Sequence, residues 1–160
     1  RVQGCTFRNA NFGILAAWNA IRRVSVVDNT FQTIGTAAIR HDNAAGEVTF
    51  SEISGNHFVA CTNGIDIVQA TQNLICRDNT FDGVSGWCLT VRDIYAGTEL
   101  RNSVFTGNHA RPNCANGLRI AVVNGAWDYC IVRDNILQPC TGIDYSLAAG
   151  NGNGVAVNNL

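Results

Sequence analysis

Asparagine recurs along this chain within one short motif. The sequence Asp-Asn-Thr-Phe occupies positions 28–31 and again positions 78–81, and Gly-Asn-His-Phe stands between them at positions 55–58. Aligned on its asparagine, the motif or a degenerate copy recurs every 23 to 29 residues, at Asn29, Asn56, Asn79, Asn108, Asn135 and Asn159. A catalytic motif is usually needed once, whereas recurrence at a regular interval indicates a repeated structural unit.

Each repeat also carries short strands. Seven to nine residues after each of the first five asparagines begins a segment of alternating apolar residues: TAAIR from Thr36, GIDIV from Gly64, CLTVR from Cys88, GLRIA from Gly117 and GIDYS from Gly142. No stretch has helical periodicity. The pattern predicts an all-β parallel β-helix of about six coils of 23–29 residues with an asparagine ladder. A leucine-rich repeat would need a leucine spacing that is missing, and a β-sandwich would leave the asparagine column unexplained.

The repeated pattern G-I-x-I … V-x-I-x-x-N-x-F resembles that of right-handed parallel β-helix proteins, which include pectate-lyase-like enzymes, polygalacturonase-like hydrolases and phage tailspikes. The resemblance covers nearly the whole chain. It implies a protein that binds or degrades a polysaccharide, as a glycoside hydrolase or a polysaccharide lyase if it is an enzyme. It also implies an extracellular or virion-surface location, and a homotrimer for a tailspike-like chain. Because this fold carries many activities, a non-catalytic structural or adhesive β-helix stays open as the alternative.

Composition excludes several other classes of function. The net charge of −1 provides no basic field for nucleic acid or an anionic membrane, and no apolar run is long enough to span a bilayer. All eleven basic residues are arginine, which rules out lysine Schiff bases and the P-loop lysine. The seven cysteines include no C-x-x-C, so we expect free buried thiols and neither metal nor cofactor. The chain begins with Arg1 and has no methionine, so we expect residues 1–160 to be one β-helix segment of a longer protein.

Equivalent residues of successive coils should form columns. Stacked asparagines can pass hydrogen bonds from coil to coil, because the carboxamide both donates and accepts. Two residues after the asparagine we expect an inward stack that turns from aromatic to aliphatic, formed by Phe7, Phe31, Phe58, Phe81, Ala110 and Leu137. Cys61, Cys114 and Cys140 recur at the position of Ile34, which predicts a second buried column. Cys114 and Cys140 would lie on adjacent coils, where a disulfide is feasible.

Function in such a fold depends on outward strand positions and on the loops that interrupt the repeat. We predict one outward row of Leu15, Ala38, Asp66, Thr90, Arg119 and Asp144, and a second of Ala17, Arg40, Val68, Arg92, Ala121 and Ser146. Within this strip, the charged side chains that we expect to bind sugar hydroxyls or the carboxylates of an acidic glycan are Arg40, Arg92, Arg119 and Asp144, alongside Asp66. A solvated sheet face with scattered ion pairs is the alternative.

The candidate catalytic residues are Asp66, Asp42 and Asp93. Asp66 and Asp144 would be three coils apart, about 14 Å, which is too far for paired action, whereas Asp42 and Asp93 would be about 10 Å apart, near the limit for an inverting pair. In a lyase, Arg92 and Arg119 would neutralise a uronate. Tyr95 and Trp127 lie in irregular segments after the strands and are candidate sugar platforms.

Overall fold

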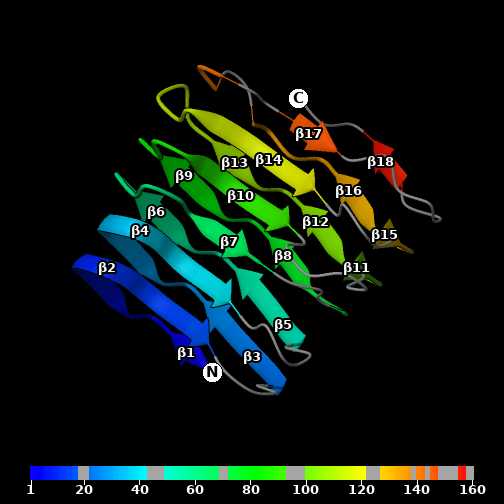
Figure 1. Cartoon of the computed structure of the whole chain (residues 1–160), viewed down its shortest axis with the longest axis horizontal. Helices are drawn as coiled ribbons and strands as arrows, with labels where there is room; N and C mark the ends of the chain where they lie inside the picture. Colours follow the sequence, from blue (N-terminus) through cyan, green and yellow to red (C-terminus); the bar gives the residue numbers. More distant parts are fainter. Residues whose placement is uncertain are drawn as a thin grey trace.

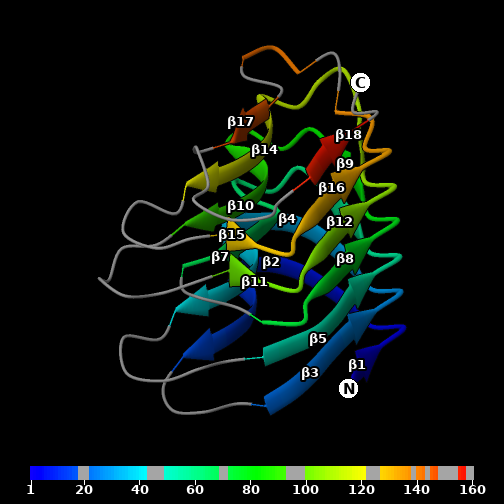
Figure 2. The ribbon, with the colours of Figure 1, turned by 90° about the vertical axis from the view of Figure 1, so that its right-hand side faces the viewer.

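The computed structural model describes residues 1–17, 22–42, 49–68, 72–92, 100–121, 127–137, 140–142, 145–147 and 155–157. These residues form an all-β parallel solenoid, and no helix occurs among them. Figures 1 and 2 show strands of successive turns stacked side by side along the axis of the solenoid. No helix suited to crossing a membrane is found in this described part. The predicted parallel β-helix is therefore confirmed.

One sheet contains the strand that precedes each asparagine. Its seven parallel strands are, in spatial order, β1 (Val2–Gln3), β3 (Arg22–Val27), β5 (Thr49–Ser54), β8 (Ile75–Arg77), β12 (Val104–Thr106), β16 (Ile131–Arg133) and β18 (Val155–Val157). Spatial order follows chain order, as a solenoid requires, and Figure 2 shows these strands rising one above another. The inward side chains include Ile53, Cys76, Phe105 and Val132, all fully buried.

A nine-stranded sheet contains the strands that follow each asparagine. Its members are β2 (Thr6–Ala17), β4 (Thr30–Asp42), β6 (His57–Val59), β7 (Ile65–Ile67), β9 (Thr80–Asp82), β10 (Trp87–Arg92), β13 (His109–Ala110), β14 (Asn116–Ala121) and β17 (Tyr145–Leu147). Long β4 pairs with both β6 and β7 of the next turn. A third, two-stranded sheet joins β11 (Leu100–Arg101) to β15 (Trp127–Asp128). On the first turns this part of the chain is one long strand, β2 or β4, whereas on the later turns it consists of two short strands.

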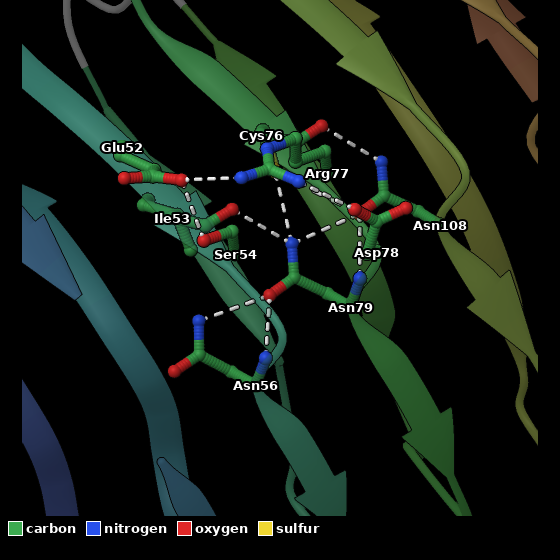
Figure 3. Close-up of polar contacts among 9 residues, drawn as sticks. All are labelled: Glu52, Ile53, Ser54, Asn56, Cys76, Arg77, Asp78, Asn79 and Asn108. Atoms are coloured by element: carbon green, nitrogen blue, oxygen red, sulfur yellow. Dashed lines mark hydrogen bonds and ion pairs between the residues drawn. The ribbon is translucent and has the colours of Figure 1, made fainter. Parts of the chain in front are cut away.

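The asparagine ladder is present and buried. The carboxamide oxygen of Asn79 accepts hydrogen bonds from the backbone N–H of Asn56 at 3.1 Å and from its Nδ2 at 3.0 Å. Asn79 Nδ2 in turn donates to the carboxamide oxygen of Asn108 and to the carbonyl of Ile53, both at 2.9 Å (Figure 3). The same pattern continues to Asn135, and at the other end the N–H of Cys5 donates to Asn29.

The solenoid makes about four turns, slightly fewer than the six coils expected. Four turns separate the first buried ladder asparagine, Asn29, from the last, Asn135. The expected count also included the turn that begins at Cys5, which has no asparagine of its own, and the turn that ends at Asn159, which lies outside the described residues.

The predicted aromatic column is also confirmed. Phe7, Phe31, Phe58 and Phe81 stack with ring centroids 4.8 to 5.1 Å apart and nearly parallel planes. Ala110 is paired with Phe81 on the next turn, and both Ala110 and Leu137 are buried. The spacing of the rings matches the distance of about 4.8 Å between neighbouring strands, so stacking follows directly from the repeat.

The residue before each ladder asparagine alternates between aspartate and glycine. Asp28, Gly55, Asp78, Gly107 and Asp134 all have φ between 53° and 63°. A Cβ built at Gly55 would lie 2.4 Å from Oδ1 of Asp28, and one at Gly107 would lie 2.5 Å from Oδ1 of Asp78. The carboxylates of Asp28 and Asp78 therefore occupy the space that a Cβ would need at the equivalent residue of the next turn. This explains why Asp-Asn alternates with Gly-Asn along the sequence.

Candidate functional site

A row of polar side chains lies on the outward face of the nine-stranded sheet. Parallel pairing aligns Arg40 with Asp66, Asp66 with Thr90, and Thr90 with Arg119. Leu15 and Ser146 continue the row at its two ends. Because Leu15, Arg40, Asp66, Thr90 and Arg119 occupy one position on successive turns, their side chains emerge side by side at the strand spacing of about 4.8 Å.

The predicted rows were wrong at two turns. Arg40, rather than Ala38, shares the row of Asp66, and Ser146, rather than Asp144, follows Arg119. Both errors are slips of two residues. Side chains alternate with a period of two, so such a slip leaves every residue on its correct face, and the hydrophobic pattern cannot detect it.

Asp66 is held by two arginines from the neighbouring turns. Nε and Nη2 of Arg92 each donate to one carboxylate oxygen of Asp66 at 3.0 Å, and Nη1 of Arg40 lies 3.5 Å from Oδ2. Arg40 also binds Asp42, with 2.7 Å between Nη2 and Oδ2. The hydrogen bonds to Asp66 are the main reason why the pKa of Arg92 is raised, whereas burial by itself would lower that pKa. The result is a continuous chain of alternating charges across three turns.

This chain of ion pairs argues against the predicted catalytic role of Asp66. Only 3% of its side chain is exposed, and both oxygens are engaged. A general acid or nucleophile in glycoside hydrolysis must reach the scissile bond. Asp42 is more accessible, at 34%, yet it is also bound to Arg40.

A shallow hollow of about 180 Å³ lies beside Asp66 on the same face. Its lining residues are Asn63, Asp66, Trp87, Thr90, Arg92 and Arg119. The guanidinium of Arg119 lies over the ring of Trp87, 5.7 Å from the centroid. Asn63 fixes the start of β10, because its carboxamide oxygen accepts the backbone N–H of Trp87 at 3.0 Å while its Nδ2 donates to the carbonyl of Thr36.

Two polar groups that line this hollow have hydrogen-bonding capacity that the described residues leave unused. Within the described part of the chain, Arg119 has no carboxylate partner, in contrast to Arg40 and Arg92. The hydroxyl of Thr90 is buried and has no hydrogen-bond partner among these residues, although Thr90 is only 4% exposed. Such a group usually indicates a missing partner. The arrangement suits a small anionic or hydroxyl-rich group.

Several predicted site residues lie outside the described residues. Asp93, Tyr95 and Asp144 are among them, so the predicted Asp42–Asp93 pair remains a prediction. The backbone of Trp127 lies in β15, which pairs with β11, but its side chain is not described.

His41 faces inward, away from the candidate site. It occupies the same column as Ala16 and Ile67 and is fully buried. Burial lowers its pKa to about 4, although the nearby carboxylate of Asp42 opposes the effect. A neutral, inward imidazole takes no part in binding at the outer face.

The sequence singled out Arg92 and Arg119 but not the groups that complete the hollow. Thr90 already stood next to Arg119 in the predicted outward row, whereas Asn63 and Trp87 became recognisable only once the structure placed them around Arg119. No group of three or more histidine, cysteine, aspartate or glutamate side chains suited to a metal ion occurs among the residues described.

Fold and site together define a class: a parallel β-helix with a strip of polar side chains on one outward face. Comparisons with protein families, with curated proteins and with solved structures find no match. The relationship to pectate-lyase-like enzymes and tailspikes therefore remains a prediction from the sequence pattern.

Proposed function

We propose that this chain binds a polysaccharide on the outward face of β4, β7, β10 and β14, and that the polysaccharide carries carboxylates. Arg119 provides the main support, because it is stacked on Trp87 and has no carboxylate partner among the described residues. An arginine held against an aromatic face presents its planar set of donors in a fixed orientation, which suits a carboxylate.

The neighbouring groups are consistent with such a ligand. Thr90 lies beside Arg119 in the row, and its hydroxyl can donate to a carboxylate or bind a sugar hydroxyl. Asp66 does not repel an anion strongly, because Arg40 and Arg92 flank it. The hollow is shallow and lies on a sheet face that continues over several turns, as binding of an extended chain requires.

The described residues support binding more strongly than cleavage. Hydrolysis of a glycosidic bond generally needs two carboxyl groups that can reach the substrate. Asp66 is buried and shared by two arginines, and Asp42 is paired with Arg40. A tailspike-like hydrolase or a pectate-lyase-like enzyme would therefore need carboxylates other than Asp66 and Asp42, such as Asp93.

Ion pairs between turns favour a second candidate, a non-catalytic structural or adhesive β-helix. Asp66 links three turns through Arg40 and Arg92, and Glu52 pairs with Arg77 on the next turn at 3.0 Å in the other sheet (Figure 3). Such pairs can serve solely to hold turns together. This candidate predicts no glycan affinity.

Isothermal titration calorimetry separates the two candidates. The full chain is titrated with oligosaccharides of equal length that contain or lack uronic acid, and only the acidic set should bind. Arg119→Gln should weaken binding about 10- to 100-fold, because a hydrogen bond to a charged group contributes about 1.5–3 kcal/mol and 1.4 kcal/mol corresponds to tenfold.

Arg133→Gln is the matched control, since Arg133 is 56% exposed on β16 of the other sheet. It should leave affinity unchanged. The proposal fails if no glycan binds, or if both substitutions weaken binding equally. Assays for reducing ends and unsaturated products, with Asp66→Asn and Asp93→Asn, test cleavage: a product lost only in Asp93→Asn would make the protein an enzyme.

Location and assembly belong to the same proposal. A polysaccharide ligand fits an extracellular or virion-surface protein, and a tailspike-like chain would be a homotrimer. Size-exclusion chromatography with light scattering measures the assembly, and a monomer at all concentrations tested would argue against the tailspike-like form.

A further inference from the structure

Three of the seven cysteines meet near the C-terminal turns. The backbone N–H of Thr141 donates to the carbonyl of Cys114 at 2.9 Å, and that of Gly142 donates to Ala115 at 2.7 Å. Cys114 and Cys140 therefore hold the same position on neighbouring turns. The thiol of Cys88 reaches this pair from the start of the adjacent strand and hydrogen-bonds with both.

The other cysteines have different neighbours. In the same column, Ser85 N–H donates to the carbonyl of Cys61, which places Cys61 beside Val84 rather than beside another cysteine. Cys76 lies between Ile53 and Phe105 in the seven-stranded sheet. Among the described residues, no cysteines besides Cys114 and Cys140 share a position on adjacent turns.

The geometry permits a bond between these two residues. Equivalent residues on stacked strands are about 4.8 Å apart, which falls within the Cα separation of about 4.4–6.8 Å found in disulfides. The seven cysteines are all reduced thiols in this structure, with no disulfide between them. Cys140 is partly exposed, whereas Cys114 is fully buried, so a reagent in solution meets Cys140 first.

The environment of Cys114 favours its thiolate. A hydrogen bond from Cys88 is the largest cause, and bonds from the backbone at Val84, Arg111 and Gly83 add to it, so the pKa of Cys114 falls to about 6 despite burial. The pKa of Cys88 is raised, mainly because it hydrogen-bonds to the other two cysteines. The thiolate is the form that attacks a disulfide, so the hydrogen bond from Cys88 favours the reactive form of Cys114.

We propose that Cys114 and Cys140 form a redox modification site that is oxidised to an intramolecular disulfide by a low-molecular-weight disulfide such as oxidised glutathione. The Cys140 thiolate attacks one glutathione sulfur, which forms a mixed disulfide and releases one glutathione thiolate. The Cys114 thiolate then attacks the Cys140 sulfur and releases the second glutathione. Two protein thiols are oxidised, one glutathione disulfide is reduced, and two protons leave. The bond covalently joins two neighbouring turns.

Intact-mass spectrometry of the full chain, before and after incubation with oxidised glutathione at neutral pH, tests this proposal. Wild type should lose about 2 Da, the mass of two hydrogens, and the cross-linked peptide should contain Cys114 and Cys140. Cys140→Ser should abolish the loss; because Cys140 is only partly buried, this substitution should disturb packing less than one at the fully buried Cys114.

Controls separate this pair from the other thiols. Cys61→Ser, in the same column, should still lose about 2 Da, since only the paired thiols are consumed. Cys88→Ser should also retain the bond, because Cys88 supports the Cys114 thiolate without being joined to it. An unchanged mass of the folded wild type overturns the proposal. So does a cross-link that includes Cys88, or a glutathione adduct on Cys140 that persists.

Discussion

Replacing one ladder asparagine by alanine should destabilise the fold far more than changing the residue next to it. Asn79 is fully buried, and Asn79→Ala removes the acceptor of the Asn56 N–H and the donor to the Ile53 carbonyl. Asn56 Nδ2 keeps its bond to Val26, and the Asn108 carboxamide oxygen keeps longer bonds from the Asn79 N–H, at 3.3 Å, and from Cys76 Sγ, at 4.0 Å. The buried Asn56 N–H therefore loses its acceptor, and the Ile53 carbonyl, which lies in a paired strand, loses one of its donors.

The expected magnitude follows from those two groups. A buried donor without a partner costs about 1–3 kcal/mol and a lost hydrogen bond about 0.5–1.5 kcal/mol, so Asn79→Ala should lower the free energy of unfolding by about 1.5–4.5 kcal/mol. The control is Asp78→Asn, at a position that is 58% exposed and, among the described residues, forms an ion pair with its neighbour Arg77 alone (Figure 3). An exposed ion pair contributes about 0–1 kcal/mol, and asparagine tolerates the positive φ of this position.

Urea denaturation at pH 7 measures both variants against wild type. The slope of free energy against urea should stay constant, so that the midpoints report stability alone. Asn79→Asp provides a second check, because the introduced carboxylate can still accept from Asn56 but faces the Ile53 carbonyl. It should be about as destabilising as alanine at pH 7. A loss below about 1 kcal/mol for Asn79→Ala, no larger than that for Asp78→Asn, would refute the ladder as a source of stability.

Two further predictions concern packing and pH. Gly64→Ala should cost about 1–3 kcal/mol or more, because the added Cβ would lie 2.4 Å from the Cys88 carbonyl and 2.6 Å from the Phe81 ring; Gly35→Ala, with no atom nearer than 3.4 Å, should change thermal stability little. His41 has a pKa of about 4 when folded and about 6.5 when unfolded, so the unfolded state binds the proton first as pH falls. Stability should drop by up to about 3 kcal/mol between pH 6.5 and pH 4, and His41→Leu should remove that component in urea titrations at each pH. An identical pH dependence in the variant, or equal costs for the two glycines, would contradict these assignments.

The architecture was predictable because a solenoid repeats the same environment on every turn. An asparagine such as Asn79, or a phenylalanine such as Phe58, meets a copy of itself one turn away, so the spacing in the sequence already reports a contact in space. Inward and outward faces were predictable for the same reason: alternation with a period of two survives in each short strand. The buried column of Cys61 and Cys114 followed from its equivalence with Ile34.

The candidate site depended on information that this alternation does not contain. A slip of two residues keeps Arg40 outward, yet it decides whether Arg40 or Ala38 lies beside Asp66. Because of this pairing, Asp66, which was predicted to be catalytic, is a buried carboxylate shared by two arginines. Of the arginines in this strip, Arg119 has no such partner among the described residues. Repetition along the sequence thus determined the fold and its columns, whereas the exact pairing of strands, which only the tertiary structure decides, determined which charges meet.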